Sequence, residues 1–213
     1  MAGTDRNLAS VSRRVDLTYR LMSRRVLRGI NLLHLGMWRL GLGPMLNAWP
    51  RSLGRYVLIT TTGRRTGRAR RTSLNYTRSG HVVYCIAGWS PRSSWFANLL
   101  AEPRVEVWLP GERRRGLGRR VEDPGEANGA MRRLLEDTKG LSKLLAGVDA
   151  ERVDDGMVEA LTQRWPVVRI DLGEPERGAG PRPGDLAWVW LLVAALVLAC
   201  RPWRRITRAA GGT

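Results

Sequence analysis

The stretch from Val57 to Asn98 constrains the fold of this chain more than any other part of the sequence. It opens with an apolar and β-branched run, Val57 to Thr62, which favours a strand, and Gly63 marks where that strand should stop. An arginine-rich turn comes next, then a second strand-like segment, a tight turn and a third strand that ends at Ala87. Because the connections are short, the strands should pair antiparallel, as in a meander that closes into a barrel.

The first turn combines glycine with a high density of arginine. Gly63 and Gly67 stand on either side of Thr66, and five arginines accompany them: Arg64, Arg65, Arg68, Arg70 and Arg71. Glycine lets the backbone approach a ligand closely, and guanidinium groups match phosphate or carboxylate oxygens in pairs. The turn therefore predicts a partner with several negative charges. A solvated surface loop, or a nucleic-acid or localisation segment, would have the same composition.

Charge and the reactive side chains narrow the function class further. The formal net charge is +17, from 36 Lys and Arg against 19 Asp and Glu, which suits a polyanionic ligand, an anionic membrane or nucleic acid. Cys85 and Cys200 provide no disulfide framework, and His34 and His81 have no carboxylates nearby, so we expect no metal site.

Three separated segments occur in an order and at a spacing that resemble a known family. They are TTTGRRTGRARRTSLNY, a strand that closes with CIAGW, and SWFANLLAEPRVEVWLPGERR. Together they resemble the deazaflavin (coenzyme F-420)-dependent nitroreductase family, of the flavin/deazaflavin oxidoreductase split-barrel superfamily, over about Tyr56 to Val121 and less closely to Leu172. The resemblance implies a mainly β, α+β fold, a split β-barrel similar to FMN-binding barrels, and coenzyme F-420 as hydride carrier, with FMN as the alternative cofactor.

The same resemblance implies which residues bind the cofactor. They come from the turn, the strand after it, the end of the third strand and the bridging helix: Arg64, Arg65, Thr66, Arg70, Arg71, Thr72, Ser73, Leu74, Asn75, Ile86, Ala87, Gly88, Trp89, Ser94, Trp95 and Asn98. Arginine suits the phosphodiester and oligoglutamate of the coenzyme tail. Trp95 could equally be a core tryptophan. Tyr76 and Ser94 are both candidates for a proton donor, and the sequence does not choose between them.

The resemblance also implies hydride delivery from C5 of the reduced deazaflavin to an electrophilic carbon or a quinone-like acceptor. Two departures argue against nitroimidazole reduction. Gly88 and Trp89 replace a polar Ser-Lys pair of the family, and residues 137–159 lack the tyrosines that line its substrate pocket.

The remaining elements follow from local signals. Ser90 and Pro91 should begin a helix to Leu100. Asp123 and Pro124 should begin a longer helix to about Leu145, with Met131, Leu134, Leu135 and Thr138 on one face. We expect the second strand to end at Tyr76 before a turn at 78–80, and further strands at Arg104–Leu109, Arg114–Val121 and Trp165–Leu172.

Both ends of the chain suggest contact with a membrane. Arg13 to about Leu40 reads as a basic amphipathic helix, which could lie on anionic lipid or pack on the barrel. Leu186 to Cys200 contains fifteen uncharged residues, about 22 Å as a helix against a hydrocarbon core of about 30 Å. We interpret it as a membrane helix that either spans or dips into one leaflet, with a buried core helix as the alternative. No secretory signal is evident.

These expectations divide the chain into four regions. Residues 1–50 form a basic helical region, 51–172 the deazaflavin-binding barrel, 173–184 a Gly/Pro linker, and 185–213 the membrane-associating helix and basic tail. The favoured function is an F-420-dependent oxidoreductase at the cytoplasmic face of the cell membrane, acting on a lipophilic, quinone-like acceptor. A homodimer is expected and nucleic acid is not. The alternatives are a non-catalytic or FMN-using cofactor or lipid carrier, and a basic nucleic-acid-binding protein.

Overall fold

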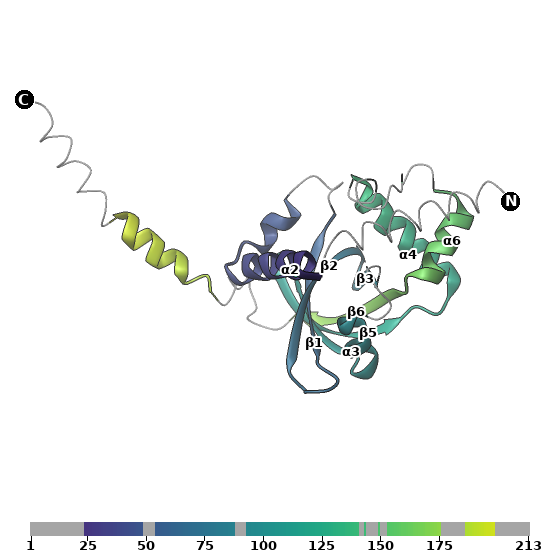
Figure 1. Ribbon diagram of the computed structural model, residues 1–213, viewed down its shortest axis with the longest axis horizontal. Coiled ribbons are helices and arrows are strands. Elements are labelled where there is room, and N and C mark those ends of the chain that lie inside the picture. Colours follow the sequence, from purple (N-terminus) through teal and green to yellow (C-terminus); the bar gives the residue numbers. More distant parts are fainter. Residues whose placement is uncertain are drawn as a thin grey trace, which may run out of the picture.

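The structure of this protein is a computed structural model that describes residues 24–48, 54–87, 93–140, 143, 149, 153–175 and 186–198. Its described residues contain six strands that close into an antiparallel barrel in the order β1-β2-β3-β6-β5-β4 (Figure 1). The strands are β1 (Tyr56–Thr62), β2 (Ala69–Ser79), β3 (Val82–Ile86), β4 (Arg104–Leu109), β5 (Glu112–Arg120) and β6 (Val167–Pro175). The predicted α+β barrel is therefore confirmed.

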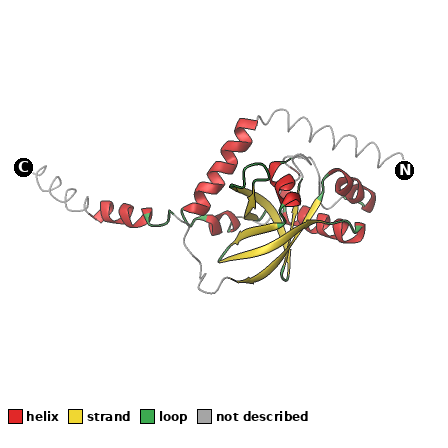
Figure 2. Ribbon diagram, turned by 90° about the horizontal axis from the view of Figure 1, so that it is seen from below, coloured by secondary structure: helices red, strands yellow, loops and turns green. Residues whose placement is uncertain are grey.

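Helices surround this barrel, as Figure 2 shows. They are α2 (Arg24–Arg39), the 3-10 helix η1 (Gly43–Asn47), α3 (Ser94–Ala101), α4 (Pro124–Asp137) and α6 (Asp155–Arg164), followed by a helix over residues 189–198. The last of these, here called the C-terminal helix, projects away from the barrel (Figure 1).

The alternation of side chains along each strand divides the apolar residues among three clusters. Val57 and Ile59 face the barrel interior, where they pack with residues of β2, β3, β4 and β6 and of α3. Leu58, between them, points outward into a cluster under α2 with Trp38 and Trp108. The third cluster lies between the outer face of β3 and β6 and the helices α4 and α6.

Several predicted boundaries are confirmed and others are wrong. β4 has the predicted bounds, and β1 ends at Thr62 as predicted but begins one residue earlier, at Tyr56. β2 extends to Ser79 because its last residues pair with β3, and the turn lies at Gly80, whose φ of +58° suits glycine. β5 begins at Glu112 and β6 at Val167.

The predicted start of the bridging helix is wrong. α3 begins at Ser94, with Ser93 as N-cap in an extended conformation, rather than at Ser90 and Pro91. A serine followed by a proline is common at the start of a helix, which is why the sequence predicted a start there. The residues that pack into the core, however, lie between Trp95 and Leu99.

The start of α4 is confirmed, because the Asp123 side chain accepts a hydrogen bond from the Glu126 N–H. Its predicted apolar face is also buried as expected. The helix ends at Asp137 rather than near Leu145. α6 was not predicted; Asp154 caps it by accepting from the Met157 N–H.

The described part of the amino-terminal helix, α2, packs on the barrel through Trp38, Leu35 and Met37. Residues 13–23, part of the same predicted helix, lie outside the described residues. The first three residues of the predicted linker, 173–175, belong to β6, which runs to Pro175, and residues 176–184 lie outside the described residues.

No helix in the described part of the chain is long and apolar enough to cross a membrane, so the predicted transmembrane helix finds no support. The alternative of a buried core helix is wrong for residues 190–198, because their side chains are exposed; Leu191, for example, is 75% exposed.

Candidate functional site

The turn between β1 and β2, residues 63–68, is a compact hydrogen-bonded structure, here called the cationic turn. The Gly63 N–H donates to the Arg68 carbonyl at 2.8 Å, and the Gly67 N–H donates to the Gly63 carbonyl at 2.7 Å. Gly67 has φ +64°, which an L side chain adopts only with strain. The Thr66 hydroxyl accepts from the Arg68 N–H at 3.4 Å. The turn thus has a defined backbone, and Thr66 helps to close it.

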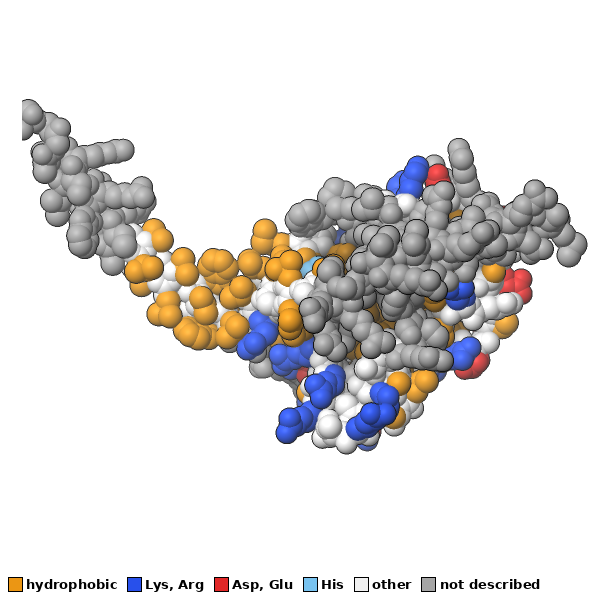
Figure 3. Space-filling model, in the orientation of Figure 1, with side chains coloured by type: hydrophobic (Ala, Val, Ile, Leu, Met, Phe, Trp, Pro, Cys, Tyr) orange, Lys and Arg blue, Asp and Glu red, His pale blue; other side chains and the backbone are white. Residues whose placement is uncertain are grey.

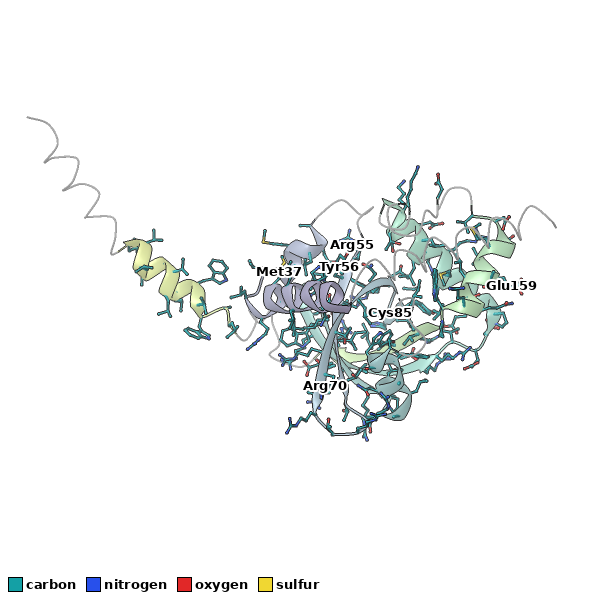
Figure 4. The ribbon with its side chains drawn as sticks, in the orientation of Figure 1. Met37, Arg55, Tyr56, Arg70, Cys85 and Glu159 are labelled. Carbon is teal, nitrogen blue, oxygen red and sulfur yellow. The ribbon has the colours of Figure 1, made fainter. Side chains whose placement is uncertain are left out.

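The arginines of this turn, together with Arg70 near the start of β2, are exposed. Arg64, Arg65, Arg68 and Arg70 are all exposed, and none makes an ion pair with another described residue. Figure 4 shows Arg70 on the β1–β2 hairpin, toward the end that extends from the barrel. Exposed guanidinium groups held on a fixed backbone form an anion-binding surface.

Asn98 of α3 fastens the turn to the barrel. Its Oδ1 accepts from the Arg64 backbone N–H and from Arg64 Nη1, both at 3.2 Å. Asn98 is only 4% exposed. Its side-chain oxygen is therefore used in hydrogen bonds to Arg64 and not to a ligand, and Asn98 acts by positioning Arg64.

The predicted binding stretch 70–75 divides between two faces of β2. Leu74 and Tyr76 point toward the interior cluster, which by strand alternation places Arg70 and Thr72 on the same face. Exposure increases along that face, from buried Tyr76 through half-buried Leu74 and Thr72 to exposed Arg70. One end of the face is apolar and the other cationic.

The other half of the stretch lies on the outer face. The Arg71 guanidinium stacks 5.5 Å from the centroid of the outward-facing Trp108 ring. Ser73 and Asn75 share this face by alternation. The structure therefore does not bring all six predicted side chains to one surface.

Over residues 69–75, β2 also has an edge that pairs with no described strand. It pairs with β3 only from Tyr76 to Ser79, so residues 69–75 have no described strand on the side away from β1. The Ser73 N–H on that edge donates to Asn31 Oδ1 of α2 at 3.0 Å. The sequence did not indicate Asn31, since the contact joins residues 42 positions apart.

The end of β3 divides in the same way. Ala87 is buried in the interior cluster with Leu74, whereas Ile86 packs outward against the α4 and α6 cluster. Gly88 and Trp89, both predicted site residues, lie outside the described residues.

On α3, Ser94 is exposed and Trp95 is 7% exposed in the interior cluster, with its ring centroid 6.0 Å from that of Phe96. Trp95 is thus part of the core, on the same side of the barrel wall as Leu74 and Ala87. Burial raises the pKa of Tyr76 above its usual value, so its hydroxyl stays protonated at neutral pH. No group of three or more metal-ligating side chains occurs in the part of the chain that the structure describes.

Comparisons with known proteins agree with this geometry. Residues 42–139 match the family model described as F420H(2)-dependent quinone reductase. The F420H(2)-dependent quinone reductase of Mycobacterium tuberculosis is 44% identical over 54 residues, which are 24% of this chain and 36% of that protein. The chain thus spans about a third of the length of the curated relatives it matches.

Solved structures of low sequence identity also resemble part of this chain. An F420-H2-dependent reductase (FDR-A) has 22% identity and a TM-score of 0.41, covering 54% of this chain and 92% of that one. A conserved hypothetical protein from Mycobacterium tuberculosis has 18% identity and a TM-score of 0.43, covering 57% and 75%. The resemblance to the deazaflavin-dependent reductases is confirmed by the family model: from residue 42 to residue 139, this chain matches the F420H(2)-dependent quinone reductase family.

Proposed function

We propose that this protein is an oxidoreductase that uses reduced coenzyme F-420 to reduce a lipophilic, quinone-like acceptor at the cytoplasmic face of the membrane. One observation carries the proposal: the wall formed by β2, the end of β3 and α3 is cationic at one end and apolar at the other. A cofactor with an anionic tail and a flat ring fits such a wall.

The cationic end suits the coenzyme tail. Its phosphodiester and oligoglutamate need several fixed positive charges, and Arg64, Arg65, Arg68 and Arg70 are exposed without acidic partners among the described residues. Asn98 fixes the backbone and guanidinium of Arg64. Less entropy is then lost when Arg64 meets an anion.

The apolar end suits the ring. Leu74, Ala87 and Trp95 belong to one cluster on this wall, and Leu74 is only partly buried within it. In our proposal Leu74 contacts the ring, while Trp95 and Ala87 support it from behind. This assignment makes Trp95 a positioning residue.

When bound, reduced F-420 supplies a hydride from C5, and a quinone that receives it needs one additional proton to become the hydroquinone. Tyr76, which keeps its proton because burial raises its pKa, lies on the proposed ring face. Ser94 is exposed at the start of α3. Either could relay this proton, and the pH dependence of hydride transfer in Tyr76→Phe and Ser94→Ala would choose between them.

The test is a titration of full-length protein in mild detergent with F-420 and, separately, with FMN, followed by fluorescence. We expect saturation with F-420 at micromolar concentration or below. The double variant Arg65→Gln/Arg68→Gln should weaken binding, and Arg120→Gln, an exposed arginine on β5, should not.

Equal F-420 affinity in the double variant and in Arg120→Gln would refute the assignment of the tail. Saturation with FMN alone would favour an FMN-using barrel. Failure to bind either cofactor, together with salt-dependent binding of DNA, would favour the nucleic-acid alternative. Homodimer formation, also proposed here, is measured by sedimentation of the same sample.

A further inference from the structure

We propose that α2 and the C-terminal helix together form a docking surface for an anionic lipid bilayer, with the C-terminal helix immersed in one leaflet. The docking surface consists of exposed apolar side chains of α2, namely Ile30, Leu32 and Leu33, and those of residues 188–198. The inference rests on the proposed function, because it identifies the lipid as the source of the acceptor.

The C-terminal helix is apolar on every side. Residues 186–198 read LAWVWLLVAALVL and contain no charged or polar side chain. Consecutive residues on different sides of the helix are exposed, including Leu191, Leu192 and Val193. A protein groove covers one side of a helix, whereas a helix that is apolar all round belongs in a core or in lipid. Figure 3 shows hydrophobic side chains covering this helix where it leaves the body of the molecule.

Two hydrogen bonds attach residues 186–190, which begin this segment and form its base, to the last residue of α2 and the residue after it. The Leu186 N–H donates to the Arg39 carbonyl at 2.8 Å, and Trp190 Nε1 donates to the Leu40 carbonyl at 2.9 Å. The two tryptophans, Trp188 and Trp190, lie at this base, and the leucines and valines lie beyond it. Tryptophan favours the headgroup level of a bilayer, so the barrel would remain in water while the helix enters the acyl region.

Length and charge favour a single leaflet of anionic lipid. At about 1.5 Å per residue, even the whole uncharged run, residues 186–200, would extend about 22 Å as a helix, short of a hydrocarbon core of about 30 Å. Arg39 stands at the base, and Arg201, Arg204 and Arg205 follow the apolar run in the sequence. Cations at both ends of a short apolar helix hold it near anionic headgroups.

The docking surface adjoins the proposed cofactor site through α2. Asn31, which lies between Ile30 and Leu32 in the sequence, accepts from the Ser73 N–H on the open edge of β2. α2 therefore contacts the lipid on one side and the cofactor-binding strand on another. In this proposal an acceptor dissolved in the bilayer lies near the strand that binds the cofactor.

The experiment compares full-length protein on vesicles of phosphatidylglycerol and phosphatidylcholine with vesicles of phosphatidylcholine alone, by flotation. We expect binding to the anionic vesicles, reduced at least tenfold in Leu191→Asp/Leu192→Asp. The matched control is Leu117→Asp, which adds a carboxylate to an exposed leucine (57% exposed) on β5 of the barrel. It should bind as the unmodified protein does.

Activity gives a second readout. Leu191→Asp/Leu192→Asp should lose its rate with a long-chain quinone dissolved in vesicles and keep its rate with a chain-free, water-soluble quinone. Equal flotation of this variant and the unmodified protein would overturn the proposal. It would also be overturned if the unmodified protein formed oligomers without lipid and did not bind the vesicles. If Leu191→Asp/Leu192→Asp reduces flotation but the unmodified protein does not bind F-420, the proposed function is refuted and the docking surface is still supported.

Discussion

Replacing Asn98 with alanine tests whether this residue positions the cationic turn. The substitution removes the oxygen that accepts two hydrogen bonds from Arg64, each 3.2 Å long. A typical hydrogen bond contributes about 0.5–1.5 kcal/mol to stability. Because Arg64 is exposed, water can replace the lost acceptor, and we expect a total loss near the lower end, about 1 kcal/mol. For a chain of this size that lowers Tm by about 2–4 °C.

The effect on cofactor binding should be larger than the effect on stability. An unfixed arginine has to be ordered when the anion binds, which costs about 1–2 kcal/mol. The Kd for F-420 should therefore rise by about 5- to 30-fold. Thermal unfolding and F-420 fluorescence titration measure the two effects in the same preparation.

A matched variant separates positioning from general destabilisation. Asn128 Oδ1 accepts from the Thr162 hydroxyl at 2.8 Å between α4 and α6, away from the turn. Asn128→Ala should lower Tm similarly and leave the Kd for F-420 unchanged. Asn98→Ala with normal F-420 affinity, or an equal loss of affinity in both variants, would refute the positioning role.

Three further outcomes follow from the described contacts. Gly67→Ala forces an L side chain into φ +64° and should cost about 1–2 kcal/mol in urea unfolding; no loss would show that the turn adopts another backbone. Leu134→Ala should cost about 2–5 kcal/mol, because Leu134 is buried between α4 and α6, and a loss under 1 kcal/mol would contradict this packing. Burial lowers the pKa of His34, so the unfolded chain takes up its proton first as pH falls below about 6.5; stability should decline below that pH, and less so in His34→Phe.

Local signals predicted the elements whose boundaries depend on neighbouring residues. β1 ends at Thr62, just before Gly63, and α4 begins after Asp123, because a glycine and a capping aspartate act within one turn of chain. The start of α3 was mispredicted because the signal of Pro91 competes with burial of Trp95, and local sequence does not measure burial.

The residues of the candidate site could be proposed from the sequence, but the contacts among them could not. The arginines of the turn were evident, and the two faces of β2 could have been separated by strand alternation. The contacts from Asn98 to Arg64 and from Asn31 to Ser73 connect residues 34 and 42 positions apart. Such pairs depend on closure of the barrel, which no short segment specifies.

The edge of β2 at residues 69–75, which pairs with no described strand, affects the tendency of the protein to self-associate. An exposed strand edge presents free backbone donors and acceptors to any other extended chain, and such edges are templates for aggregation. Asn31 accepts a hydrogen bond from the Ser73 N–H. In this way α2 protects the edge from pairing with another strand, in addition to its proposed role in the docking surface. A chain shortened to begin at Gly41 should therefore self-associate through strand pairing, detectable as larger species in light scattering, whereas the chain that retains α2 should not.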